Sequence, residues 1–158
     1  MIRFSEYVSP GHPDKIADYI SSYLLDRYIE RDPDTRYAVE VQIKGLFVTL
    51  GGEVTSKCCF TDREIHHYVR EAVKDIGYTE DYIEMWGAEN TISGDLLEVE
   101  CIISQQSPDI ARGLKGWGDQ GIFFGHATYL PQTGFMPMDY TLARRLNKAL
   151  FESGIGGL

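Results

Sequence analysis

Residues 11–15 have the types and spacing of a site for phosphate groups and a metal ion. They read Gly11-His12-Pro13-Asp14-Lys15 and stand at the start of an amphipathic helix. Pro13 suits the first helical position, where its missing N–H costs nothing. An imidazole, a carboxylate and an ammonium therefore lie beside the N–H groups of a helix start, which attract phosphate. The alternative is that Pro13 and Asp14 only begin the helix.

Three further segments place polar side chains next to glycine or proline at the ends of predicted elements. They are Gly51-Gly52-Glu53, Gln105-Gln106-Ser107-Pro108-Asp109-Ile110 and Gly118-Asp119-Gln120-Gly121. Glycine lets a ligand approach the backbone, and binding sites are commonly built where elements end. Structural interpretations exist for each: Glu53 as an edge-strand charge, Ser107-Pro108 as a helix start, and 118–121 as a hairpin turn. Their joint occurrence favours a binding site.

Helical spacing and end signals predict three helices. Apolar residues at helical spacing predict the first over 13–31, and Asp32-Pro33 ends it. A capping box at Thr61–Glu64 precedes an apolar stripe that predicts the second helix, which ends at Gly77. The third is expected to begin at the cap Asp139, to carry leucines at every fourth position, and to end before Gly154.

Apolar patterns between these helices predict the strands. Strict alternation predicts strands over 37–43 and 97–103, with Glu40 opposite the valine face of the first. Short apolar runs predict strands over 46–50, followed by two glycines, and over 122–124 as a buried strand. This order of elements predicts an α+β fold, a two-layer α/β sandwich.

Composition and charge exclude some classes of binding partner. The chain has 158 residues, 43% of them hydrophobic, and a formal net charge of −9. Such a surface argues against nucleic acid or an anionic membrane as a partner. A nucleotide can still bind if metal ions or local lysines bridge the charge. The sequence contains neither a long apolar run nor a signal-peptide core, so we expect a cytoplasmic location.

The three cysteines make a poor disulfide framework, which also favours a reducing cytoplasm. Adjacent Cys58 and Cys59 together with His66-His67 superficially suggest a zinc site. Neighbouring residues point to different faces of their elements, however, and the spacing is not that of ordinary zinc ligands. We expect exposed histidines and buried thiols instead.

In this order, the four polar segments resemble those of S-adenosylmethionine synthetases (methionine adenosyltransferases). Other matching segments extend over almost the whole chain; they include Ser5-Glu6, Asp32-Pro33, Gly51-Gly52-Glu53-Val54-Thr55, Ile76-Gly77-Tyr78, Phe124-Gly125-His126-Ala127-Thr128, Met136-Pro137 and Leu142-Ala143. The resemblance implies the α+β fold of that family, here its first unit and the opening of the second. Residues 1–108 would form the N-terminal unit, and 109–158 a connector and the start of a central unit that we expect to be truncated.

The resemblance implies the synthesis of S-adenosylmethionine from ATP and L-methionine, followed by cleavage of the released triphosphate to pyrophosphate and phosphate. A thioether sulfur carries no proton, so its attack on the ribose C5′ needs no general base. The reaction needs in-line positioning and stabilisation of a highly charged leaving group. Metal ions, lysines and an imidazole donor supply that stabilisation.

The resemblance also assigns residues to the ATP and metal sites. His12 is expected to act as a catalytic, ATP-binding residue near the breaking C5′–O bond, and Asp119 to approach the substrate amine and ribose. Asp14 would be a Mg²⁺ ligand, and Glu40 would belong to a K⁺ site. Two Mg²⁺ ions per site and K⁺ are the cofactors that the family implies.

On the methionine side, the resemblance implies that Glu53 holds the ammonium group and that Gln106 lies at the methionine end of the pocket. Sites in the family lie between subunits, so a homo-oligomer, dimer or tetramer, is expected. The connector between Ile110 and Asp119 is shorter than the family's mobile loop, which predicts weaker closure over the substrates.

The resemblance places the triphosphate-binding lysines, a further Mg²⁺ carboxylate and the adenine contacts in later units of the family. No GxxxxGK[ST] or GxGxxG motif replaces them here. We therefore expect the isolated 158-residue chain to be inactive. Two alternatives remain: a non-catalytic methionine-binding or regulatory protein, and a partner that dimerises with a full-length synthetase through its sheet face. The presence of His12, Asp14 and Glu53 favours the enzyme.

Overall fold

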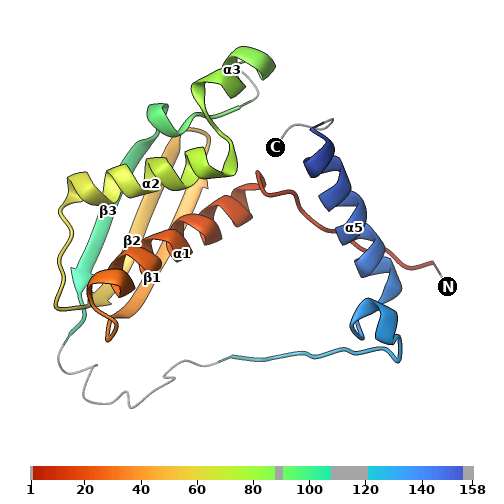
Figure 1. The fold of residues 1–158 in the computed structure, drawn as a ribbon. Helices are drawn as coiled ribbons and strands as arrows, with labels where there is room; N and C mark the ends of the chain where they lie inside the picture. Colours follow the sequence, from red (N-terminus) through yellow and green to blue (C-terminus); the bar gives the residue numbers. More distant parts are fainter. Residues whose placement is uncertain (1, 88–90, 108–120, 155–158) are drawn as a thin grey trace. The chain divides into compact units, whose positions relative to one another are not determined.

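The computed structural model describes residues 2–87, 91–107 and 121–154 of the chain. It divides into two compact units, Pro10–Gly113, here the sheet unit, and Met1–Ser9 with Leu114–Leu158, here the α5 unit. In the sheet unit, two helices pack on one face of a three-stranded sheet (Figure 1). The predicted α+β class with two layers is confirmed.

The sheet is mixed, with the strand order β1-β2-β3. Strands β1 (Arg36–Lys44) and β2 (Phe47–Thr55) are antiparallel and are joined by a tight turn in which Gly45 has φ +57°. Strand β3 (Glu98–Gln105) returns parallel to β2 after the second helix. Three of the four predicted strands, those in this unit, therefore exist in the predicted order.

The prediction that β2 stops at Leu50 is wrong, because the strand continues through both glycines to Thr55. Gly52 pairs with Val39 of β1 and has φ +143°. A Cβ atom at this position would lie 2.1 Å from the carbonyl oxygen of Ala38. Gly52 thus marks a close approach of two backbones inside the strand rather than a strand end.

Helices α1 (Pro13–Arg31) and α2 (Asp62–Ile76) lie side by side over one face of the sheet (Figure 1). The capping box and the glycine cap predicted for α2 are both present. Buried side chains from the two helices and the sheet meet between the layers; they are Ile16, Ile20, Leu24, Tyr28, Val39, Val48, Leu50, Val54, Ile65, Val69, Ala72 and Val73. A short helix, α3 (Glu80–Trp86), was not predicted, because it has only seven residues and its start has no side-chain cap.

In the α5 unit, helix α5 (Met138–Ser153) ends at Gly154 as predicted, where the backbone is left-handed. Its cap is Pro137, so the prediction of Asp139 as the cap is wrong, and Asp139 lies in the first turn. The strand predicted at 122–124 is not formed, and its three side chains are 85–94% exposed. Among the described residues, no helix has the length and apolar character needed to cross a membrane.

A buried carboxylate joins the end of α1 to the segment after β2. Asp32 is only 4% exposed, and its side chain accepts hydrogen bonds from the Lys57 N–H at 2.7 Å and the Ser56 hydroxyl at 3.0 Å. The N–H of Asp34 is a third donor, at 3.2 Å. These donors, led by the Lys57 N–H, lower the pKa of Asp32.

We expect Asp32→Asn to flatten the acid limb of the stability profile. A carboxyl whose pKa is lowered by folding stabilises the native state above its unfolded pKa of about 4, and this stabilisation is lost as the pH falls through the lower native pKa. Thermal unfolding between neutral and acid pH should show a smaller loss in the variant. Asp34→Asn is the control, because Asp34 is 83% exposed; an equal effect of both variants would contradict this role of Asp32.

Candidate functional site

His12 and Asp14 form the beginning of α1. His12 is the N-cap, and its Nδ1 accepts a hydrogen bond from the Asp14 N–H at 3.2 Å. An accepting Nδ1 carries no proton, so Nε2 carries it and remains the donor of the ring. The Asp14 carboxylate is 92% exposed and lies 3.9 Å from the same ring nitrogen. The segment thus offers an N–H donor and a carboxylate to a ligand, while also capping the helix.

Tyr78 fixes the backbone that leads into this segment. Its side chain is 8% exposed, and its hydroxyl donates to the carbonyl oxygen of Gly11 at 3.0 Å. Burial raises the pKa of Tyr78, which keeps the hydroxyl protonated as a donor.

We expect Tyr78→Phe to lower the free energy of unfolding by about 1 kcal/mol, the usual net contribution of one hydrogen bond. Urea unfolding measures this change. Tyr23→Phe is the control, because Tyr23 contacts Arg27 through its ring, which phenylalanine retains. Equal stability of the Tyr78→Phe variant and the parent would contradict the anchoring role.

Glu40 and Glu53 lie on the face of the sheet that is turned away from the helices, here the open face. Val39 of β1 and Val54 of β2 are buried on the helix side, so the alternation of each strand places its glutamate on the other side. The expected polar placement of Glu40 opposite the valines is confirmed. Glu53 pairs with Ala38 on one side and with Ser104 on the other, so it occupies the middle strand.

Gln106 joins this group from the end of β3. Its Oε1 accepts a hydrogen bond from the Thr55 hydroxyl at 3.1 Å. Thr55 shares the open face with Glu53, two residues earlier in β2. The structure therefore brings the two residues predicted to bind methionine to neighbouring strands at one end of the open face. Thr55 was part of the sequence motif but had no predicted role, because a cross-strand partner is set by register.

Gly51 leaves a gap on the open face beside these glutamates. It pairs with Glu40 on one side and with Ile102 on the other, and a Cβ atom placed on it would meet no atom within 4 Å. The missing side chain leaves room between the Glu40 and Glu53 rows for a ligand to reach the sheet. This gap, bounded by two carboxylates, suits a cationic group or a metal ion better than an anion.

The structure does not bring the two predicted halves of the site together within one sheet unit. Gly11 lines the same cavity as Lys44, at the end of β1 that is remote from Glu53. Glu53 pairs with Ala38, six residues away, which corresponds to about 20 Å along the strand. Asp119 and the short connector before it lie outside the described residues.

The donors present fit the metal ions that the sequence suggests. Asp14 supplies one exposed carboxylate, and Mg²⁺ typically takes one or two carboxylates and completes its shell with water and phosphate. Glu40 supplies carboxylate oxygens, and oxygen is also the ligand atom that K⁺ prefers. In the described part of the chain, no group of three histidine, cysteine, aspartate or glutamate residues could hold a metal by itself.

The expectation of buried thiols is wrong. Cys59 is exposed, and Cys58 and Cys101 are half-buried. The reason is that Cys58 and Cys59 lie in the segment between β2 and α2, outside the packed layers. His67 is exposed, as expected, while His66 is half-buried.

Known proteins resemble the chain over most of its length. Residues 1–108 match the family described as S-adenosylmethionine synthetase, N-terminal domain. The S-adenosylmethionine synthases of Desulforudis audaxviator and Aquifex aeolicus are 40% and 36% identical over 92% and 96% of this chain. A solved structure, described as an unusual S-adenosylmethionine synthetase from Campylobacter jejuni, aligns over 97% of this chain with a TM-score of 0.82 and 32% identity, and 37% of its own length is covered. The chain spans 38% of the length of the two curated relatives.

Proposed function

Because the chain belongs to the S-adenosylmethionine synthetase family, we propose that it forms the N-terminal, methionine-binding part of an enzyme that makes S-adenosylmethionine from ATP and L-methionine. The observation that carries this proposal is the grouping of Glu53, Gln106 and the gap at Gly51 on one open sheet face. A carboxylate beside an open gap suits the ammonium group of an amino acid. The amide of Gln106, held by Thr55, would contact the other end of the same ligand.

The α1 start would serve the ATP side of the reaction. When the methionine sulfur displaces the triphosphate from C5′, negative charge develops on the leaving oxygen. His12 would donate its Nε2 proton in a hydrogen bond to the triphosphate, and its Nδ1 is held as an acceptor by the helix backbone. This orientation lets the ring stabilise the departing charge as a hydrogen-bond donor.

Metal ions would supply the remaining charge compensation. Bound Mg²⁺ would neutralise the phosphate oxygens, with Asp14 as one of its ligands. Glu40 pairs with Gly51 and would hold K⁺ beside this gap. The ion would lie near the carboxylate group of the methionine substrate, while Glu53 contacts its ammonium group. A chain of net charge −9 needs such cations to bind a polyphosphate.

Two copies of the chain would together supply the His12 part and the Glu53 part of one site. His12 and Glu53 lie at opposite ends of one sheet, separated by about 20 Å along β1. A two-fold dimer that apposes two open faces would bring the α1 end of one copy toward the Glu53 end of its partner. This arrangement explains why the methionine and ATP residues are remote within one sheet unit.

A fusion experiment tests the proposed function. The chain would replace the matching segment of the Aquifex aeolicus synthase, and product formation from ATP and L-methionine with Mg²⁺ and K⁺ would be followed by mass spectrometry. We expect S-adenosylmethionine from the fusion and none from the 158-residue chain alone, since 62% of the length of that relative has no counterpart in these residues. A folded fusion without product would favour a non-catalytic binding protein.

A further inference from the structure

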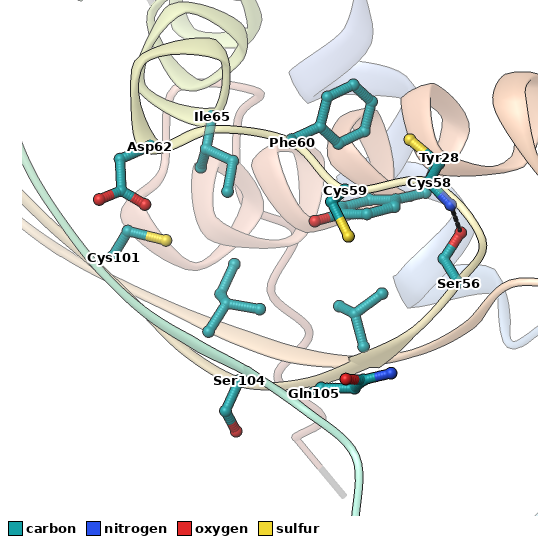
Figure 2. A pocket seen from close by; sticks show the side chains of 12 residues that line it. Tyr28, Ser56, Cys58, Cys59, Phe60, Asp62, Ile65, Cys101, Ser104 and Gln105 are labelled. Atoms are coloured by element: carbon teal, nitrogen blue, oxygen red, sulfur yellow. Dashed lines mark hydrogen bonds between the residues drawn. The ribbon is translucent and has the colours of Figure 1, made fainter.

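A second cavity lies on the other face of the sheet, between strand β3 and the segment that links β2 to α2. Its volume is about 160 Å³. Figure 2 shows the side chains that line it. Tyr28, Phe60, Ile65 and Ile103 contribute apolar walls, and Asp62 contributes a carboxylate. An engineered apolar cavity of about 150 Å³ holds a benzene molecule, so a cavity of this size suits a group of a few heavy atoms.

All three cysteines of the chain line this cavity. In Figure 2, the thiol of Cys59 points from the linking segment toward the sheet, and that of Cys101 comes from β3 below Asp62. The Cys58 sulfur turns to α1, where the Arg31 guanidinium donates to it at 4.0 Å. The three thiols therefore differ in access: Cys59 is exposed, and the other two are half-buried.

The thiols also differ in reactivity, because the thiolate is the nucleophile. Burial raises the pKa of Cys101, so this thiol stays protonated at neutral pH. Cys58 is half-buried and its sulfur is turned to α1, away from the sheet, so a reagent in the cavity reaches Cys59 more directly (Figure 2). Cys59 combines exposure with direct access to the cavity, and this combination distinguishes it as the thiol that reacts first.

Charge and size select the group that the cavity takes. Asp62 places a carboxylate at the cavity wall near Cys101, away from the Cys59 sulfur (Figure 2). A short aminothiol attached to Cys59 would pass along the apolar wall and bring its ammonium toward Asp62. A bulky thiol exceeds the volume of the cavity, and an anionic thiol is repelled by the Asp62 carboxylate.

We propose that Cys59 is a site of reversible modification by small aminothiol disulfides, whose attached group occupies this cavity. The Cys59 thiolate attacks one sulfur of the disulfide; the new bond joins Cys59 to that sulfur, and the disulfide bond of the reagent breaks. The leaving aminothiol takes the electron pair and the proton that Cys59 released. Cys59 is thereby oxidised to a mixed disulfide, and the reagent is reduced by the same two electrons.

Intact-protein mass spectrometry of the 158-residue chain with cystamine tests the proposal. We expect a first kinetic phase in which one adduct forms per chain. This phase should have the same rate in Cys58→Ser and should be absent in Cys59→Ser. Dithiodiglycolate, an anionic disulfide of similar size, should react about tenfold more slowly, because the sign of its interaction with Asp62 is reversed. The thermal unfolding of the adduct should match that of the parent, since the group fills an existing cavity.

Two matched variants separate the local charge from the net charge of the chain. Asp62→Asn should reduce the preference for cystamine severalfold, whereas Glu84→Gln, the same charge change on the exposed face of α3, should leave it unchanged. First modification at Cys58 or Cys101, or an equal effect of the two charge variants, would overturn the proposal. The readouts are mass and rate, so they do not depend on S-adenosylmethionine synthesis.

Discussion

In the fusion with a relative's remaining domains, Glu53→Gln is expected to raise the KM for methionine about 100-fold with a small change in kcat. The carboxylate would hold the substrate ammonium, and a hydrogen bond between charged groups contributes about 3 kcal/mol at most when one charge is removed. The contact is made equally in the ground state and the transition state, so its loss acts on KM. Initial rates over a range of methionine concentrations measure the effect.

Glu98→Gln is the matched control for this prediction. Glu98 lies on the same open face but pairs with Phe47, at the end of β2 remote from Glu53. We expect the KM for methionine of the Glu98→Gln fusion to equal that of the parent fusion. A KM that rises equally in both variants would show a general charge effect, and an unchanged KM in Glu53→Gln would remove Glu53 from the methionine site.

The second large effect is expected from Gly52→Ala, which should lower the free energy of unfolding by about 4 kcal/mol. The new methyl group would stand 2.1 Å from the Ala38 carbonyl oxygen, and the backbone φ of +143° is strained for any L side chain. Overpacking costs about 1–3 kcal/mol, and a disfavoured backbone conformation adds about 1–3 kcal/mol. Urea unfolding followed by circular dichroism measures the change.

The neighbouring glycine supplies the control for this substitution. Gly51 has a negative or extended φ and open space at its Cβ position, so Gly51→Ala should change stability by less than about 1 kcal/mol. The same variant should weaken methionine binding in the fusion, because it fills the gap between Glu40 and Glu53. Equal destabilisation by both alanines would contradict the close approach of β1 at Gly52.

The helices were predictable because their signals are local. Pro13 at the first position, the Thr61–Glu64 capping box and the glycine at 77 all lie within a turn of the ends they set. The three strands of the sheet were predictable for the same reason, two of them from alternation and the one at 46–50 from a short apolar run. The predictions that failed concern features that depend on a neighbouring strand. Gly52 was predicted to follow the end of a strand, but it lies within β2, against the backbone of β1. The apolar run at 122–124 forms no strand.

The site shows the same division between local and non-local information. Alternation placed Glu40 opposite the valines without any structure, because the side-chain period of a strand is fixed. The contact of Gln106 with Thr55, and the distance between His12 and Glu53, depend on strand register and on the position of α1. A single sequence contains no local signal for either, so the separation of the site into two halves emerged only from the fold.

The most direct test of the central claim is the activity of a hybrid dimer. Two fusion variants, His12→Ala and Glu53→Ala, would carry different tags, be co-expressed, and be purified through both tags. If one copy supplies His12 and its partner supplies Glu53, each hybrid contains one intact site and one site with both substitutions. We predict that, at methionine concentrations near the parental KM, each variant alone forms almost no product and the hybrid forms S-adenosylmethionine at about half the parental rate. An inactive but folded and dimeric hybrid would contradict the claim, because it would mean that both residues act within one copy.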